Sequence, residues 1–230
     1  MTISLSLTVN MSITEIIFFA AELIGTAAFS IAGTLVAIRR ELDVFGAVVV
    51  GTVTAVGGGC IRDILLGQFP PMMFKTPIYT VLAASFAVAV FILEYIIAGR
   101  KILESKTYET AVNICDALGL AVFVVVGINT ATKSGHGDKA FLSVFVGVLT
   151  GIGGGIMRDL FVGAVPMVLR KQVYALPAIV GGVIYYIMAR NNVNNIISVL
   201  VVIILIMTVR ILAAKFRWHL PRIKQKNEQQ

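Results

Sequence analysis

Seven predominantly apolar runs, each close to the length that crosses a lipid bilayer, constrain this chain more than any other feature. They lie at about residues 13–37, 44–66, 77–98, 110–131, 139–162, 173–190 and 195–214. About 20 apolar residues in a helix span the hydrocarbon core, and a helix keeps its backbone groups hydrogen-bonded internally. Because 58% of the 230 residues are hydrophobic and only 13% are charged, the sequence predicts an all-α membrane protein with seven transmembrane helices.

The distribution of Lys and Arg between the connecting segments predicts how the chain is oriented. Thirteen of these residues, Arg210 among them, fall on the side that holds the loops at 38–43, 99–109 and 163–172 and the C-terminal tail, and four fall on the other side. The positive-inside rule therefore places the N-terminus outside and the C-terminus in the cytoplasm. The basic tail at 215–230 is expected to contact anionic lipid headgroups at the cytoplasmic face, which accounts for the net charge of +7 without nucleic acid as a partner.

The chain also repeats itself. Residues 51–75 align with 147–171 at ten identical positions of 25, and residues 22–37 align with 116–131 upstream of them. We therefore expect one transmembrane domain over 1–230, with repeat 1 at about 13–98, repeat 2 at about 110–190, and a seventh helix at about 195–214 that has no partner. Since each repeat has three spans, the second copy enters the membrane from the opposite side, and the two repeats are predicted to be inverted.

Each repeat carries three consecutive glycines inside a span. They are Gly57, Gly58 and Gly59 in repeat 1 and Gly153, Gly154 and Gly155 in repeat 2. Three interior glycines cost a helix about 3 kcal/mol relative to alanine, so the sequence favours a bend or break that exposes backbone carbonyls to a watery constriction. Close helix packing, which small residues allow in lipid, is the alternative interpretation.

Four charged side chains follow the glycines at equivalent positions. Arg62 and Asp63 stand in repeat 1, and Arg158 and Asp159 in repeat 2. A charge at the bilayer centre costs about 3 kcal/mol. Adjacent helical residues do not face each other, so we expect partners elsewhere, Glu22 and Asp116 included. The four charges either line or gate a pathway, or they form an ion-pair network that locks the two repeats together.

The first span also carries a polar stripe. Glu22, Thr26, Ser30 and Thr34 recur every four residues, so they share one helix face. The fourth span offers only Asp116 and Asn129 in comparable places. Glu22, Ser30, Thr34, Asp116 and Asn129 are therefore candidates for a pore lining, although Ser and Thr also bond to the preceding turn of their own helix.

An enzyme is not expected from this sequence. It contains no nucleophile and base in a recognisable pattern, and the glycine triplets lack the Lys-Ser/Thr that completes a phosphate loop. The two cysteines, Cys60 and Cys115, and the two histidines form no metal-binding or disulfide pattern. We expect no cofactor and no metal site.

The duplicated GGGxxRDxxxGxxP motif in a three-plus-three-plus-one membrane protein resembles the TRIC family, the trimeric intracellular cation channels, in its bacterial and archaeal branch. The resemblance covers residues 13–214. It implies a homotrimer with one pore per protomer, lined by the first, second, fourth and fifth spans, and kinks at both glycine triplets. It also implies conduction of K⁺ and Na⁺. Eukaryotic members carry a Lys-Glu type motif where this chain has Arg-Asp, so their voltage and lipid regulation is not carried over, and a prokaryotic plasma membrane is expected.

The function predicted from these features is a monovalent cation channel. Arg62 and Arg158 would stand beside the constriction as tethered cations that act in gating or in packing. A secondary carrier of a small solute such as glycine would also use inverted repeats and broken helices, and a non-conducting scaffold would use the glycines for packing alone. Permeant K⁺ or Na⁺ and bound lipid are the only small partners expected.

Overall fold

The computed structural model describes residues 12–97, 106–170, 174–216 and 218. Regular structure in these ranges is helical. The predicted tail beyond residue 218, the loop residues 99–105, position 98 at the end of the third predicted span and position 173 at the start of the sixth lie outside the described residues.

The helices follow the predicted spans closely. In chain order they are α1 (Ile13–Arg39), α2 (Val44–Leu65), α3 (Met72–Lys75), α4 (Ile78–Ile97), α5 (Lys106–Ala131), the π-helical segment η4 (Thr132–His136), α6 (Ala140–Phe161), α7 (Met167–Arg170), α8 (Leu176–Arg190) and α9 (Asn195–Lys215).

Six helices are long and apolar enough to cross a bilayer: α1, α2, α4, α5 with its extension, α6 and α9. The chain is therefore an integral membrane protein. The predicted sixth span at 173–190 corresponds to α8, which has only 15 residues in its described part and is shorter than the roughly 20 that a full crossing requires.

Local sequence fixes where several of these helices begin. Ser12 and Glu15 form a capping box at the start of α1, in which each side chain accepts the backbone N–H of the other residue. Asp43 caps α2 by accepting the N–H of Gly46 at 2.7 Å. Asn194 accepts the N–H of Ile196 at the start of α9.

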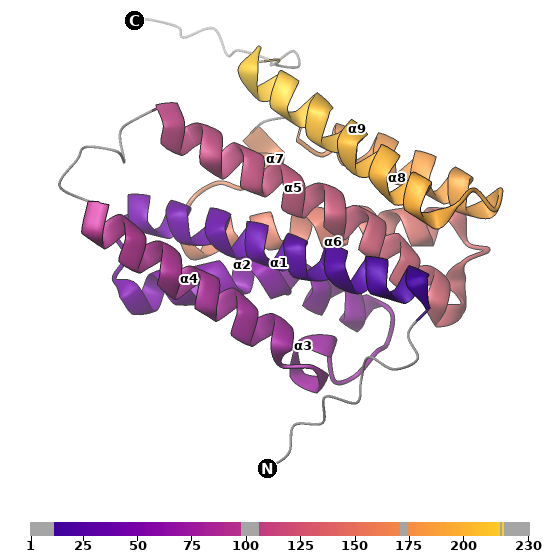
Figure 1. The fold of residues 1–230 in the computed structure, drawn as a ribbon, viewed down its shortest axis with the longest axis horizontal. Helices are drawn as coiled ribbons and strands as arrows, with labels where there is room; N and C mark the ends of the chain where they lie inside the picture. Colours follow the sequence, from indigo (N-terminus) through magenta and orange to yellow (C-terminus); the bar gives the residue numbers. More distant parts are fainter. Residues whose placement is uncertain (1–11, 98–105, 171–173, 217, 219–230) are drawn as a thin grey trace, which may run out of the picture.

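The long helices lie side by side with their axes roughly aligned, with α4 along one side of the bundle and α9 along the opposite side (Figure 1). Most of α5 is buried, whereas α4 exposes most of its side chains. The main core cluster is built on the apolar run of α5 from Leu120 to Val126, against which Phe29 of α1 and Ile206 of α9 are also buried. Helix α5 is therefore the centre of the bundle.

Helices from the two halves of the chain cross in antiparallel directions at glycines. A Cβ atom on Gly58 of α2 would stand 2.1 Å from the carbonyl oxygen of Thr150 in α6, and one on Gly154 of α6 would stand 2.1 Å from the carbonyl oxygen of Thr54 in α2. Since Thr54 and Thr150 are aligned with each other in the repeat, as are Gly58 and Gly154, the crossing makes the same contact twice.

Of the bend or break that the sequence favours at the glycine triplets, the break is wrong, and the bend stays a prediction. All six glycines are α-helical, and α2 and α6 continue through them to Leu65 and Phe161. The alternative interpretation explains the central glycine of each triplet, because a side chain at Gly58 or Gly154 would overlap the backbone of the facing helix.

Candidate functional site

Two clusters of charged side chains lie inside the bundle, one at the end of α2 and one at the end of α6. In the first cluster, the Nε of Arg62 donates to Oδ1 of Asp63 at 2.8 Å. The other carboxylate oxygen of Asp63 accepts the backbone N–H of Met72 at 2.7 Å. Asp63 therefore ties the end of α2 to the start of α3, and both charged residues are buried.

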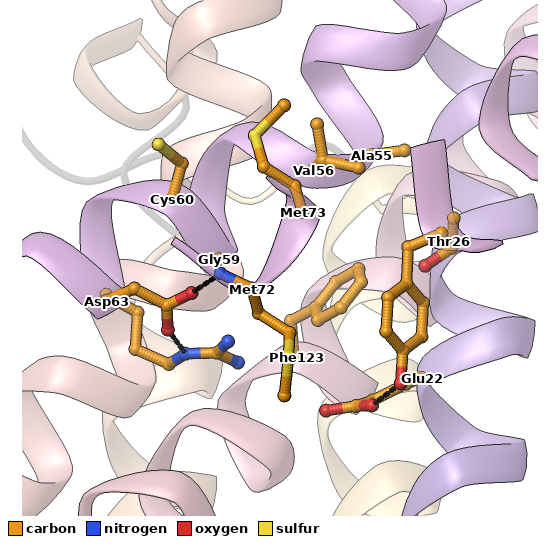
Figure 2. A pocket seen from close by; sticks show the side chains of 12 residues that line it. Glu22, Thr26, Ala55, Val56, Gly59, Cys60, Asp63, Met72, Met73 and Phe123 are labelled. Carbon is orange, nitrogen blue, oxygen red and sulfur yellow. Dashed lines mark hydrogen bonds and ion pairs between the residues drawn. The ribbon is translucent and has the colours of Figure 1, made fainter. Parts of the chain in front are cut away.

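Glu22 of α1 belongs to the same region as this first cluster. Its carboxylate accepts a hydrogen bond from the hydroxyl of Tyr79 in α4. A cavity of about 40 Å³ lies between this pair and Asp63. Figure 2 shows Glu22 on one side of the cavity and Asp63 on the other, with Met72 and Phe123 between them.

The second cluster repeats the geometry of the first. The Nε of Arg158 donates to Oδ1 of Asp159 at 2.9 Å, and Oδ2 of Asp159 accepts the backbone N–H of Met167 at 2.6 Å. Asp159 thus joins α6 to α7 as Asp63 joins α2 to α3. In both halves, the Arg-Asp pair therefore stabilises the turn between a long helix and the short helix that follows it.

Asp116 of α5 carries additional bonds that Glu22 lacks. Its Oδ1 accepts from Nη1 of Arg158 at 2.7 Å, and its Oδ2 accepts from Nη2 of Arg210 at 2.6 Å. The hydroxyl of Tyr174 also lies 3.3 Å from Asp116, and the guanidinium of Arg210 stacks over the Tyr174 ring at 3.8 Å. Asp116 and Arg158 are fully buried. Low local dielectric strengthens such a network and makes it costly to disturb.

The expectation that the charges would find partners elsewhere is confirmed for Asp116 and wrong for Glu22. Arg158 bonds to Asp116 as well as to its neighbour Asp159, but Arg62 bonds to Asp63 and not to Glu22. Adjacent residues do pair here because the Nε of each arginine reaches the next carboxylate along the helix.

The polar stripe of α1 is divided between two environments. Thr26 lines the cavity together with Glu22. Ser30 is buried and donates to the carbonyl of Ala83 at 2.6 Å, and Thr34 bonds to the preceding turn at Ser30. The bond of Ser30 holds α4 against α1, and the two bonds satisfy both hydroxyl groups.

Asn129 lies thirteen residues from Asp116 on α5, which is about 20 Å along the helix axis. It is half-buried near the end of that helix. The structure therefore does not bring Asn129 together with Asp116 or with the Arg158 cluster.

Three residues of the clusters were not found by sequence reasoning: Arg210, Tyr79 and Tyr174. Arg210 was counted among the basic residues of the cytoplasmic side, but it is only 9% exposed and bonds to Asp116 inside the bundle. One signal could have identified it. Arg210 interrupts the apolar run of the last span with four further residues to go before the predicted end, and an intramembrane charge calls for a buried partner.

A larger cavity, of about 560 Å³, lies where the end of α1 meets the starts of α5 and α7. Arg39, Arg40, Tyr108 and Glu109 line it, and Asp159 of the second cluster also contributes to its wall. Arg39 pairs with Glu109 at 3.5 Å in this cavity. Along α1, the two cavities are therefore separated by the ten helical steps from Thr26 to Val36, or about 15 Å.

These features define a class of protein: a polytopic helical membrane protein in which two similar Arg-Asp clusters lie on crossing helices. A family model described as a glycine transporter matches the chain over residues 19–95 and 113–190. The chain is also 35% identical over 199 residues to the UPF0126 inner membrane protein YadS of Escherichia coli, which covers 86% of this chain and 91% of that protein.

Solved structures show the same likeness over almost the whole chain. A prokaryotic TRIC channel crystallised in 0.5 M KCl superposes with a TM-score of 0.79 at 33% identity, covering 90% of this chain and 100% of that one. A TRIC trimeric intracellular cation channel orthologue from Rhodobacter sphaeroides gives 0.79 at 28% identity, with 88% and 99% covered. This chain belongs to the TRIC family, as its duplicated motif predicted.

Proposed function

We propose that this protein is a monovalent cation channel that conducts K⁺ and also Na⁺. The observation that carries the proposal is its likeness, over about nine tenths of the chain, to solved TRIC cation channels. These solved structures are of channels rather than enzymes. The acidic groups that border the small cavity, Glu22 and Asp63, are of the sign that attracts cations.

The proposed pathway joins the two cavities past the crossing of α2 and α6. The small cavity leads to Glu22 and the large one to Asp159. The central constriction is at the crossing, where Gly58 and Gly154 bring backbone against backbone. Because the helices touch there, conduction requires α2 and α6 to move relative to each other.

The proposed architecture is a homotrimer of protomers with one pore each, and the related Rhodobacter structure is described as trimeric. Seven spans form two inverted repeats plus α9. The inversion is supported by the reciprocal contacts of α2 with α6 and of α1 with α5, where Phe123 meets Gly25 and Phe29 meets Gly119. The N-terminus lies outside and the C-terminus in the cytoplasm of a prokaryotic plasma membrane.

We assign the two arginines different parts in this channel. Arg158 is held by Asp116 and Asp159 together and locks the second half. Arg62 has one acidic partner within the described residues and lines the small cavity, so it is free to exchange partners and gate the pathway. Movement of one charge through the whole membrane field is worth about 2.3 kcal/mol per 100 mV, which is enough to bias such an exchange.

The test is single-channel recording of the purified protein in planar bilayers under a KCl gradient. Discrete openings that reverse near the K⁺ equilibrium potential are expected. Arg62→Gln is expected to change open probability and its voltage dependence. Unchanged gating in Arg62→Gln would remove Arg62 from the gate while leaving the channel in place.

A carrier of a small solute such as glycine is the second candidate, because the matching family model is described as a glycine transporter. Glycine uptake into liposomes separates the two candidates. Saturable uptake and exchange without unitary currents would establish the carrier, whereas currents without glycine uptake would establish the channel.

A further inference from the structure

The two halves of the protein allow an internal comparison of one carboxylate site. Glu22 aligns with Asp116 in the repeat, and each accepts a hydrogen bond from a tyrosine hydroxyl. Tyr79 stands seven residues after Met72, and Tyr174 stands seven after Met167, so the tyrosines are equivalent as well. The same carboxylate and phenol therefore occur twice in the bundle.

The two sites differ because the second contains an additional positively charged side chain. In the second half, the guanidinium of Arg210 bonds to Asp116 and lies over the ring of Tyr174. Arg210 comes from α9, the helix without a partner in the first repeat. Within the described residues, no Lys or Arg side chain pairs with Glu22.

The charges of the two clusters differ accordingly. Asp116 and Asp159 are matched by Arg158 and Arg210. In the first half, the one positive charge that Glu22 and Asp63 face among the described residues is that of Arg62. In the part of the chain that the structure describes, the first cluster thus has one positive charge fewer than the second.

We propose that Arg210 is a tethered cation that holds, beside Asp116, the position that a monovalent metal cation takes beside Glu22. Arg210 thereby confines cation binding to the first half of the protein. This inference rests on the proposed function and names, within that pathway, the cation site and the residue that abolishes its counterpart.

The chemistry beside Glu22 suits an alkali cation. A carboxylate and the hydroxyl of Thr26 border the small cavity, and hard cations prefer such oxygen ligands. The ring of Tyr79 also lines this cavity, at the position equivalent to that of Tyr174, whose ring Arg210 covers. The cavity of about 40 Å³ exceeds the space that one water molecule needs, so it admits a K⁺ ion of similar size.

The experiment measures K⁺ linkage to thermal stability. The Tm of the purified protein is followed as KCl replaces N-methylglucamine chloride at constant ionic strength, because the dependence of stability on ion concentration reports how many ions bind. The Tm of the wild-type protein is expected to rise with K⁺ concentration as binding of one K⁺ ion predicts. Glu22→Gln is expected to abolish this rise.

Arg210→Met leaves Asp116 with Arg158 and Tyr174, so it should create a second site. We expect the slope of Tm against log[K⁺] to increase about twofold relative to the wild-type slope. Arg210→Lys keeps the charge and should retain the one-site slope. Asp116→Asn combined with Arg210→Met removes both charges, so it should fold and return to the one-site slope.

Equal K⁺ slopes in the wild-type protein, Arg210→Met and the double variant would overturn the inference, as would a K⁺ slope that survives Glu22→Gln. If Arg210→Met alone fails to fold, the comparison of the wild-type protein with Glu22→Gln still tests whether K⁺ binds beside Glu22. Arg210→Gln then replaces Arg210→Met in the test for a second site beside Asp116. Bilayer recordings decide the proposed function separately, because currents without these slopes reject only the cation site, and slopes without currents reject only the channel.

Discussion

The two halves of this protein contain the same chain-turning device but treat the neighbouring carboxylate in opposite ways. Asp63 and Asp159 each bond to the preceding arginine and to the first backbone N–H of the following short helix. Glu22 borders a cavity, whereas Asp116 is enclosed by two guanidinium groups. The contacts of Asp63 and Asp159 are thus common to both halves, and the difference lies in the carboxylate on the first helix of each repeat.

This difference follows from the energetics of buried charge. A fully buried carboxylate is tolerated only when ion pairs and hydrogen bonds compensate its lost hydration. Asp116 has such partners because α9 brings Arg210 to it. The first repeat has no equivalent of α9 within the described residues, and Glu22 lines a cavity instead.

The largest expected effect is the loss of stability when Asp116 is replaced by its amide, compared with the same change at Glu22. Asp116→Asn leaves Arg210 buried without its acidic partner, so it should lower the free energy of unfolding by about 3–5 kcal/mol. Glu22→Gln should cost less than about 1 kcal/mol because Glu22 lines a cavity and its replacement leaves no buried guanidinium without its acidic partner. Reversible SDS unfolding of the purified variants measures both. Equal losses of unfolding free energy would mean that the two carboxylates are equally shielded from water.

The next prediction concerns the crossing, where the halves should behave alike. Gly58→Ala and Gly154→Ala each place a Cβ within 2.1 Å of a backbone carbonyl oxygen, which no side-chain rotation relieves. Each should destabilise the protein by about 3 kcal/mol. Gly59→Ala is the matched control, since its Cβ would meet nothing nearer than Arg62 at 3.7 Å.

The Gly59→Ala control should be neutral or stabilising by up to about 1 kcal/mol, because alanine favours the helix more than glycine does. The same unfolding assay reports all three variants. A tolerated Gly58→Ala would show that α2 and α6 are less tightly packed than the contacts at this crossing require.

Smaller effects are expected from the tyrosines. Tyr174→Phe removes a hydroxyl from the sealed network beside Asp116 and should cost about 1 kcal/mol. Tyr79→Phe removes the equivalent hydroxyl beside Glu22, where water from the cavity can replace it, and should cost less. A larger loss for Tyr79→Phe in the unfolding assay would contradict the contrast between a sealed and an accessible site.

Much of this arrangement could be predicted from the sequence. The duplicated segment identified both Arg-Asp pairs, and the cost of intramembrane charge correctly required a partner such as Asp116 for Arg158. Helix bounds agree with the predicted runs because apolar length and caps such as Ser12 and Asp43 are local signals.

The remaining features depend on tertiary contacts. Glycine weakens a helix and also permits close packing, and only the position of Thr150 opposite Gly58 decides between these roles. The charge of Arg210 counts toward the cytoplasmic side in the sequence, but a charge near the end of a span can reach either the headgroups or a buried acid. The sequence does not say that α9 packs beside Asp116.

The last prediction concerns chemical modification of the two cysteines. The modification should leave the stability of the protein nearly unchanged, but the two thiols should react at different rates because water reaches them differently. Both cysteines are half-buried, but Cys60 lines the small cavity, whereas Cys115, which precedes Asp116, lines neither of the two cavities described above. A charged methanethiosulfonate reagent dissolves in water rather than lipid, so it should modify Cys60 at least about tenfold faster, since access limits thiol reactivity. Intact-mass spectrometry of Cys115→Ser and Cys60→Ser measures each thiol alone. Similar rates would mean that water reaches both halves equally, and the contrast between Glu22 and Asp116 would then rest on charge pairing alone.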